Sequence, residues 1–330
     1  MRAGMSGNRG GVAGGVAHVV IAGAFGGPEV LSVVEEPVPD PGPGEARIEI
    51  RAAGVNPVDV KSYSGAFGTD PSRLPIRLGA EAAGMVTTIG PDTAGPAGPV
   101  RVGDEVIAYR APGAYASELV VPAQAVIPKP DALDWQQAAG LLLTGVTAWH
   151  LLVATAVGAG DTVLIHGASG GVGLMAVQLA ALRGARVVAT ASPARHDLLR
   201  DLGALPVAYS PGLAGRVRTA APAGVDAALD LVGTDEAWDV SLGLVADKAR
   251  VATIVAAARG LRAGIKVLGG APGADPGSEI RQRARLDLAR LAQDGKLRVL
   301  VSQTFPLADA AAAHRVILDG HTAGKIALSP

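Results

Sequence analysis

A short apolar run, a glycine-rich turn and a helical pattern follow one another in residues 161–184. The run from Thr162 to Ile165 predicts a strand that ends in the glycine-rich turn. Beyond the turn, apolar residues recur at helical spacing, at Leu174, Val177 and Ala181. A second apolar run, Arg186 to Thr190, follows one helix later. This order predicts a right-handed strand-helix-strand unit.

Further apolar runs along the chain predict four more strands of the same sheet. They cover residues 204–209, 225–233, 250–255 and 265–270. Six strands with helices between them are typical of an α/β protein with a doubly wound parallel sheet.

A helical pattern continues after the last of these strands, over residues 280–294. Its leucines predict one buried stripe and its arginines a face in solvent, and the leucines are Leu286, Leu288 and Leu291.

The first third of the chain instead has short apolar runs between turns that are rich in proline and glycine. The runs cover residues 18–22, 31–34, 47–53, 102–108 and 114–121. This pattern predicts a compact β domain, with a domain boundary near Ala138.

One segment, Trp135 to Gly160, contains no charged residue and is long enough to span a bilayer. Its glutamines, threonines and glycines, and its direct continuation into a sheet strand, favour a helix buried between the domains instead. We therefore expect no membrane segment. The glycine-rich residues 1–16 lack the features of a secretory signal and are expected to form a flexible extension.

Composition narrows the class of protein. The chain has 330 residues, of which 49% are hydrophobic and 18% are charged, so it can bury a core for two domains. The formal net charge of −1 argues against a nucleic-acid surface. The absence of cysteine excludes disulfides, cysteine nucleophiles and thiolate zinc sites, and it favours a cytoplasmic enzyme.

The turn after the first sheet strand fits a dinucleotide-binding pattern, with alanine in place of the first glycine. Glycines there let the backbone approach a pyrophosphate and let the helix pack on the strand, while free N–H groups face the phosphates. The alternative is a glycine-rich turn that only connects two elements. The candidate cofactor-binding residues are Ala168, Ser169, Gly170, Gly171, Val172 and Gly173.

The end of the second sheet strand bears on the choice of cofactor. In NAD-binding folds of this kind an acidic residue there takes the ribose hydroxyls. Here the strand runs into Ser192 without an acid, and Arg195 follows. A hydroxyl and a guanidinium suit a 2′-phosphate, so the sequence favours NADPH over NADH. A solvated arginine at a helix start is the alternative.

Three further motifs, 54–65, 78–86 and 321–328, make a resemblance recognisable together with the glycine turn. The chain resembles a zinc-independent medium-chain dehydrogenase/reductase of the quinone oxidoreductase (zeta-crystallin-like) branch. The resemblance implies a GroES-like β-barrel catalytic domain, residues 1–137 plus 273–330, and a Rossmann NADPH-binding domain, residues 138–272. The active site would lie in the cleft between them.

The same resemblance implies positions for the two ends of the cofactor. It assigns Tyr209 to the adenosine-phosphate end, and Ile254 and Gly270 to the neighbourhood of the nicotinamide. It also places Thr147 near the nicotinamide, where the alternative is a hydroxyl that bonds its own helix backbone.

Departures from the zinc alcohol dehydrogenases predict that no metal is bound. Those relatives have a cysteine where Asn56 stands and a histidine where Ala80 stands, and catalytic zinc needs about three protein ligands. A structural zinc lobe of four cysteines is impossible in this chain. We interpret Glu81 as a buried carboxylate that is bound to backbone or to an arginine.

Asn56 is the first candidate for catalysis, because its amide can donate to a substrate oxygen or to the cofactor. The alternative is an Asn-Pro turn in which the side chain only caps backbone. Asp59 is expected to orient this loop. Tyr63 and Tyr109 are candidate proton donors, with the alternative that each ring only lines the cleft.

These features favour NADPH-dependent reduction of quinones or related conjugated carbonyls by hydride transfer without zinc. An enoyl or enone reductase of a biosynthetic pathway and a non-catalytic NADPH-binding protein of crystallin type are the alternatives, and a metal-dependent alcohol dehydrogenase is disfavoured. Since the apolar run Ile265 to Leu268 could pair with its copy at the sheet edge, we expect a homodimer.

Overall fold

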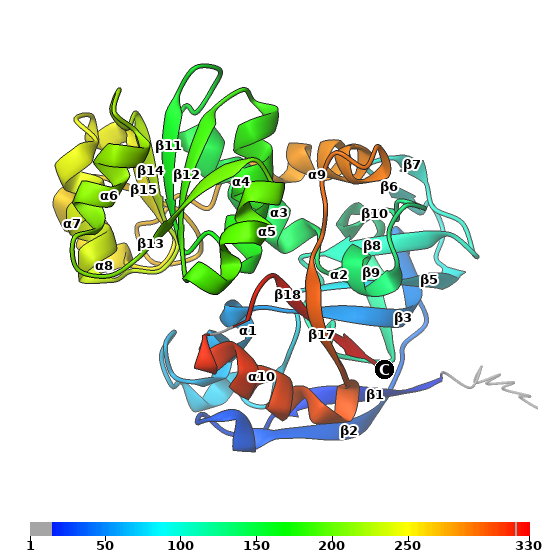
Figure 1. Ribbon diagram of the computed structural model, residues 1–330. Coiled ribbons are helices and arrows are strands. Elements are labelled where there is room, and N and C mark those ends of the chain that lie inside the picture. Colours follow the sequence, from blue (N-terminus) through cyan, green and yellow to red (C-terminus); the bar gives the residue numbers. More distant parts are fainter. Residues whose placement is uncertain (1–14, 321) are drawn as a thin grey trace, which may run out of the picture.

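The computed structural model describes residues 15–320 and 322–330. The first 14 residues of the expected extension, and the histidine at 321 of the C-terminal motif, lie outside this description. Two bodies are visible in Figure 1, a sheet covered by helices at upper left and a β-barrel at lower right. The chain leaves the barrel, builds the sheet body and returns to the barrel.

The sheet body confirms the predicted α/β fold with a doubly wound parallel sheet. All its pairings are parallel, and the strand order is β13-β12-β11-β14-β15-β16. The strands are β11 (Thr162–His166), β12 (Arg186–Ala191), β13 (Ala204–Ala208), β14 (Ala227–Asp230), β15 (Val251–Thr253) and β16 (Lys266–Val267). The helices between them are α4 (Gly171–Leu182), α5 (His196–Asp201), α6 (Leu213–Ala220), α7 (Asp235–Leu244) and α8 (Ala257–Ala263).

Alternate side chains of the central strands enter different cores, because successive residues of a strand point to opposite faces. Ile165 and Ala189 pack in one core, and Leu164 and Val188 in the other. Both faces of the sheet are therefore buried.

The barrel is built on a sheet of order β10-β8-β5-β3-β18-β17, in which β9 also pairs with β3. A second sheet has the order β2-β1-β4, and β6 and β7 form a hairpin. The strands are β1 (Val16–Ala22), β2 (Leu31–Pro37), β3 (Glu45–Val55), β4 (Ile76–Arg77), β5 (Glu81–Ile89), β6 (Ala94–Gly95), β7 (Gly98–Pro99), β8 (Glu105–Tyr109), β9 (Glu118–Pro122), β10 (Val126–Pro128), β17 (Val301–Pro306) and β18 (Lys325–Ser329). Two helices, α1 (Pro57–Tyr63) and α10 (Ala310–Asp319), accompany them.

Two strand expectations differ from the structure at their ends. The run at 114–121 becomes a strand only at Glu118, because Tyr115 bonds through its backbone to Val20 and Leu78 instead. Strand β1 already includes Val16, so the expected extension over residues 1–16 is too long by at least this residue.

The expected single uncharged helix over 135–160 is wrong: it is two helices, α2 (Trp135–Ala139) and α3 (Leu142–Ala154). The break lies at Gly140, where the backbone passes close to other segments. A methyl group built on Gly140 would lie 3.2 Å from Cγ of Lys325 and 3.3 Å from Cγ1 of Val299. Within the described residues, no helix is both long and apolar enough to cross a membrane.

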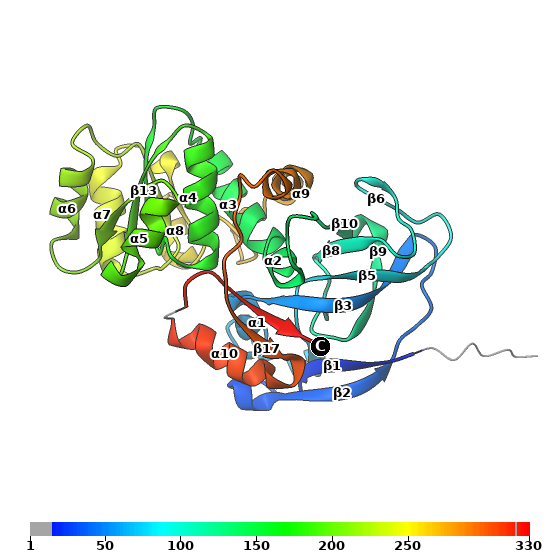
Figure 2. The ribbon, with the colours of Figure 1, turned by 45° about the vertical axis from the view of Figure 1, so that its right-hand side comes forward.

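Helix α9 (Ser278–Gln293) confirms the predicted helix and its buried Leu288, which packs beside Gly145 of α3. The expectation that all its arginines face solvent is wrong for Arg285. That side chain is buried, and its Nη1 donates to the carbonyl of Gln124 at 2.8 Å. Figure 2 shows α2, α3 and α9 between the sheet body and the barrel.

One hydrophobic core runs through this junction. It contains Ala52 and Ile107 from the barrel strands together with Val163 and Ile165 from the central strand of the sheet. The two bodies therefore share buried side chains at their junction.

Candidate dinucleotide site and cleft

The turn between β11 and α4 is closed by glycine. A methyl group on Gly173 would lie 2.4 Å from the carbonyl oxygen of Gly167 and 2.6 Å from that of Ala168. Gly170 is the extended residue before the helix, with φ −76° and ψ 172°. The first N–H groups of a helix have no partner within it and carry positive partial charge, so this turn can hold a pyrophosphate.

The C-terminal segment lies directly against this turn. Gly324 N donates to the carbonyl of Ser169 at 3.0 Å, and Gly170 and Gly324 form an isolated parallel bridge. On the other side, Ala168 N donates to the carbonyl of Thr190 at 3.1 Å. The turn is thus held by the sheet and by the strand that completes the barrel.

Polar side chains occupy the carboxyl ends of the four central strands, at His166, Thr190, Asp230 and Thr253. Asp230 organises the loops that follow: its Oδ1 accepts from Gly233 N at 2.8 Å, and its Oδ2 accepts from Thr253 Oγ1 at 3.0 Å. Burial lowers the pKa of His166 to about 4, so its ring is neutral. Sequence reasoning missed this row, although Thr190 ends a predicted strand, His166 follows one, and Asp230 and Thr253 lie within the last residues of two others.

The other end of the candidate cofactor site lies after β12. Arg195 lines a cavity of about 270 Å³ together with residues from the C-terminal part of the chain, which are Ser302, Gln303, Val316, Asp319, Thr322 and Ala323. Ser192 stands before this arginine in the loop and is half-buried. Tyr209 is 58% exposed just beyond β13. A guanidinium is suited to bind a phosphate.

Ile254 and Gly270 lie just after strands β15 and β16, at the other side of the sheet from β12 and β13. Ile254 is half-buried and Gly270 is exposed. The loop of Gly270 folds back on itself, since Gly269 N donates to the carbonyl of Asp275 at 2.9 Å. Asp275 in turn lies 3.2 Å from Nε2 of His150 in α3. This loop is therefore tied to the helix that carries Thr147.

Thr147 makes the helix-backbone bond that was the alternative to a cofactor contact. Its Oγ1 donates to the carbonyl of Leu143 at 2.7 Å and accepts from Nη1 of Arg281 at 3.3 Å. Arg281 also donates from Nε to Nδ1 of His150 at 3.3 Å. Neither the arginine nor the histidine was singled out in the sequence, because their contact joins positions 131 residues apart.

On the barrel side, Asn56, Glu81 and Lys325 form a buried cluster beneath the glycine turn. Nδ2 of Asn56 donates to Gly54 O and to Glu81 Oε1, each at 3.1 Å. Asn56 is 1% exposed, and these two bonds use both hydrogens of its amide. The side chain therefore does not project freely into the cleft, which differs from the expectation of a donor to the substrate.

Glu81 is the buried carboxylate that the sequence predicts, but its cationic partner is a lysine instead of an arginine. Its Oε1 lies 3.0 Å from Lys325 Nζ, and its Oε2 accepts from Leu143 N at 2.7 Å. Lys325 Nζ also donates to Asn56 Oδ1 at 2.5 Å and to Val55 O at 3.0 Å.

Asp59 orients the loop as expected, since its Oδ2 accepts from Asn56 N at 2.9 Å. It also accepts from the hydroxyl of Tyr115 at 3.0 Å, and that hydroxyl lies 3.1 Å from Nε2 of His314. Burial raises the pKa of Asp59 to about 7, against the lowering effect of the Tyr115 bond. Burial lowers the pKa of His314 to about 4.

The chain of bonds ends at Tyr63, whose hydroxyl lies 2.8 Å from Nδ1 of His314. Tyr63 is fully buried, and burial with nearby Glu29 raises its pKa to about 12. The ring therefore lies inside the barrel core and does not line the cleft, because helix α1 turns it toward α10. Tyr109 is also buried, at 5% exposure, and stands opposite Glu81 in the pairing of β5 with β8.

The donor set does not fit catalytic zinc. The oxygens of Asn56 and Glu81 that could face a cation accept hydrogen bonds from the ammonium of Lys325. In the part of the chain that the structure describes, no group of three or more histidine, aspartate or glutamate side chains could hold a metal.

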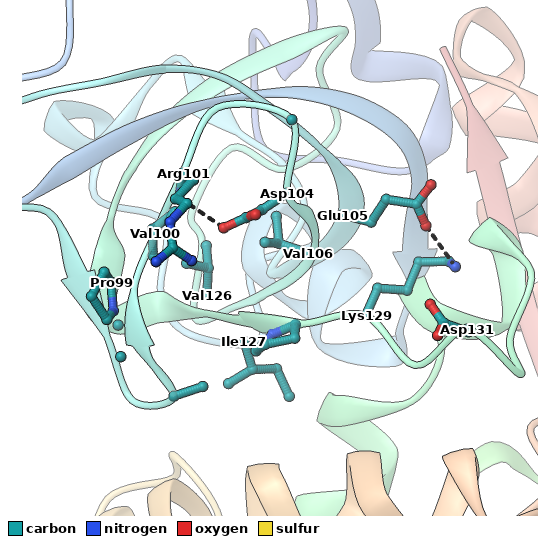
Figure 3. A pocket seen from close by; sticks show the side chains of 15 residues that line it. Pro99, Val100, Arg101, Asp104, Glu105, Val106, Val126, Ile127, Lys129 and Asp131 are labelled. Atoms are coloured by element: carbon teal, nitrogen blue, oxygen red, sulfur yellow. Dashed lines mark hydrogen bonds and ion pairs between the residues drawn. The ribbon is translucent and has the colours of Figure 1, made fainter.

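A larger cavity, of about 470 Å³, lies in the barrel away from the glycine turn. Figure 3 shows it between the β6–β7 hairpin and strands β8 and β10, with Lys129 paired to Glu105 at 3.0 Å. Residues of the dinucleotide turn do not line it. It is lined by residues of the β6–β7 hairpin and of strands β8 and β10, and its size does not make it the functional site.

Comparison with known proteins agrees with this architecture. Residues 42–131 match the family model described as alcohol dehydrogenase GroES-like domain, and residues 202–328 match zinc-binding dehydrogenase. The chain is 33% identical to the quinone oxidoreductase of Pseudomonas aeruginosa, over 93% of this chain and 98% of that protein. It is 34% identical to the spectinabilin polyketide synthase system protein NorB of Streptomyces orinoci, over 96% of this chain but only 14% of that protein.

Among solved structures, the quinone oxidoreductase of Escherichia coli complexed with NADPH superposes with a TM-score of 0.83. The match has 29% identity and covers 95% of this chain and 100% of that one. A GroES-like barrel joined to a six-stranded nucleotide-binding sheet defines the medium-chain dehydrogenase/reductases. Within that class, the chain belongs to the quinone oxidoreductase branch.

Proposed function

We propose that this protein reduces quinones or related conjugated carbonyls by hydride transfer from NADPH, without zinc. The chain is an NADPH-dependent oxidoreductase, in keeping with its relatives. Reduction without zinc is supported by the buried ammonium of Lys325. It donates hydrogen bonds to the oxygens of Asn56 and Glu81 beneath the dinucleotide turn, so these oxygens are not available to a metal. An electron-poor acceptor takes hydride without a metal that polarises an alcohol.

Bound NADPH supplies the hydride, and the chain supplies position and exclusion of water. The N-terminus of α4 holds the pyrophosphate, while Ser192 and Arg195 hold the 2′-phosphate beside Tyr209. Ile254 and Gly270 flank the nicotinamide. The wall made by β3, β5 and α3 closes the cleft from the barrel side.

The first test is loss of NADPH absorbance when the purified protein meets a small quinone or an acyclic enone, with NADH as the comparison. Quinone turnover with NADPH preferred is the expected result. Turnover of the enone alone would replace this proposal with an alkene reductase. Binding of NADPH without turnover of either substrate would support a crystallin-type binding protein.

The enone alternative has its own observation, the similarity to one polyketide synthase system protein over 96% of this chain. The hydride acceptor of an enone must also receive a proton, and Tyr109, which stands opposite Glu81 where β5 pairs with β8, is a candidate donor. Tyr109→Phe should then slow enone reduction at least tenfold and leave NADPH affinity unchanged.

The choice of cofactor is tested at Arg195. Replacing it by glutamine removes charge-assisted bonds to a 2′-phosphate, each worth roughly 1.5–3 kcal/mol. We expect Arg195→Gln to lose about tenfold or more of the kcat/KM preference for NADPH over NADH. Arg218→Gln, at an exposed position of α6, is the control. An unchanged preference in Arg195→Gln would contradict this assignment.

Zinc independence is tested by elemental analysis. The purified, active protein should contain far less than one zinc per chain, and a chelator should leave turnover unchanged. Stoichiometric zinc whose removal abolishes turnover would contradict the proposal.

We also propose the division of labour between residues 138–272 as cofactor domain and residues 1–137 with 273–330 as catalytic domain, in a cytoplasmic enzyme. A homodimer would form through the edge of the sheet at β16, beyond which no further strand of the described chain is paired. Light scattering should give twice the chain mass of 32.9 kDa, and a monomeric mass would contradict this.

A further inference from the structure

Lys325 connects the two halves of the candidate site through one side chain. Its backbone follows Gly324, which is bonded to the glycine turn, and it begins strand β18 of the barrel. The side chain is 4% exposed. Its stem lies against the start of α4, since a methyl group on Gly171 would come within 3.2 Å of Cδ of Lys325.

The ammonium at the end of this stem is fully bonded. Its three hydrogens match three acceptors at 3.0 Å or less, which are Val55 O, Asn56 Oδ1 and Glu81 Oε1. Glu81 carries the connection further, because its other oxygen accepts from Leu143 N in the first turn of α3. One cation therefore holds the end of β3, the start of β5 and, through Glu81, helix α3.

We propose that Lys325 is a positioning residue, a built-in cation that couples the dinucleotide turn to the barrel wall of the cleft. This inference rests on the proposed function only for the identity of the substrate. The ammonium has no free hydrogen to donate to a substrate, so its effect passes through the main chain of the turn and through Asn56 and Glu81.

Charge and contact can be separated by substitution. Lys325→Met keeps the stem against Gly171 but removes the cation, and it leaves the buried carboxylate of Glu81 without its partner. Breaking one side of a buried ion pair is costlier than removing both sides. The double variant Lys325→Met with Glu81→Gln leaves no unpaired buried charge and is therefore expected to fold. Lys296→Met, which changes an exposed lysine, is the control.

The first readout is NADPH binding, measured by fluorescence of the bound cofactor. We expect Lys325→Met to weaken NADPH binding about tenfold, and the double variant to recover the thermal midpoint without recovering the NADPH affinity. If the double variant binds NADPH and turns over as the wild type does, the residue is only an ion-pair partner and the proposal fails.

The second readout is rescue by a small amine. Lys325→Ala leaves room for a cation, so methylammonium at tens of millimolar should restore NADPH affinity at least threefold, while tetramethylammonium, which donates no hydrogen bond, should not. Equal effects of the two ions would overturn the role of the donated bonds. Wild-type protein that binds NADPH but reduces no quinone would refute the substrate assignment and leave this test intact.

Discussion

Gly173 has no room for a side chain, and this single position decides whether the turn can form. In Gly173→Ala the new methyl would collide with two backbone carbonyls at 2.4 and 2.6 Å. We expect a loss of about 2 kcal/mol or more in the free energy of unfolding and at least a tenfold loss of NADPH affinity. Urea unfolding and cofactor fluorescence measure the two effects.

Gly215 provides the matched control, because it lies in helix α6 with nothing within 4 Å of a built methyl group. Alanine there should stabilise the protein by about 0.5–1 kcal/mol through helix propensity and reduced freedom of the unfolded chain. Equal losses in both variants would show that the turn geometry is not responsible.

Asp59 gives the protein a pH dependence with a definite sign. Its pKa is about 7 in the folded state because of burial, against 3.8 for the ordinary group. Between these values the folded protein holds a proton that the unfolded chain releases, so the Asp59 contribution to stability is present below pH 4 and is lost as pH rises through 7.

Asp59→Asn removes this term, so the variant should gain on the wild type as pH rises from 5 to 7, with a slope of up to about 1.4 kcal/mol per pH unit. The buried His166 and His314 have the opposite effect. Their contribution to the stability of the folded state is present above their ordinary pKa of 6.5 and is lost as pH falls toward 4. They are present in both proteins and cancel in the difference.

For single residues, the sequence predicts which positions matter better than it predicts which residues they contact. The glycine turn and the buried Glu81 are readable because spacing along the chain encodes them. The lysine on Glu81 comes from 244 residues away, and His314 meets Tyr63 across 251 residues. Such contacts depend on how the chain returns to the barrel, which local pattern does not contain.

Helix α9 shows how an element gains its place from packing. Its amphipathic pattern is readable, and the buried Leu288 follows from it. The sequence does not predict what Leu288 packs against. It fits beside Gly145 of α3, where a methyl group built on the glycine would come within 3.0 Å of Cδ1 of Leu288. The same reason explains Arg285, which is buried because α9 also meets the barrel at Gln124.

Leu288→Ala should cost about 2–5 kcal/mol, since it leaves a cavity at the junction of the two bodies. Leu182→Ala, at a 48% exposed position in α4, should cost less than about 1 kcal/mol. Urea titrations give both values. A small cost at Leu288 would mean that α3 and α9 close over the cavity.

For the whole molecule, the shared core predicts that both bodies unfold together. NADPH at about 100 times its Kd should add roughly 2.7 kcal/mol to the stability of the folded state and shift a single calorimetric transition upward by about 5 °C. Two transitions, with only one shifted by NADPH, would show that the sheet body and the barrel unfold independently.

Strand β18 lies between β3 and β17 in the finished barrel, although 269 residues separate Asn56 from Lys325. A growing polypeptide therefore completes its nucleotide-binding sheet before the barrel can close. During synthesis on the ribosome, the C-terminal end of β3 waits for its pairing with β18, and the bonds of Lys325 to Val55, Asn56 and Glu81 form only when that strand emerges. The order of translation thus places the closure of the barrel by β18 after the completion of the nucleotide-binding sheet.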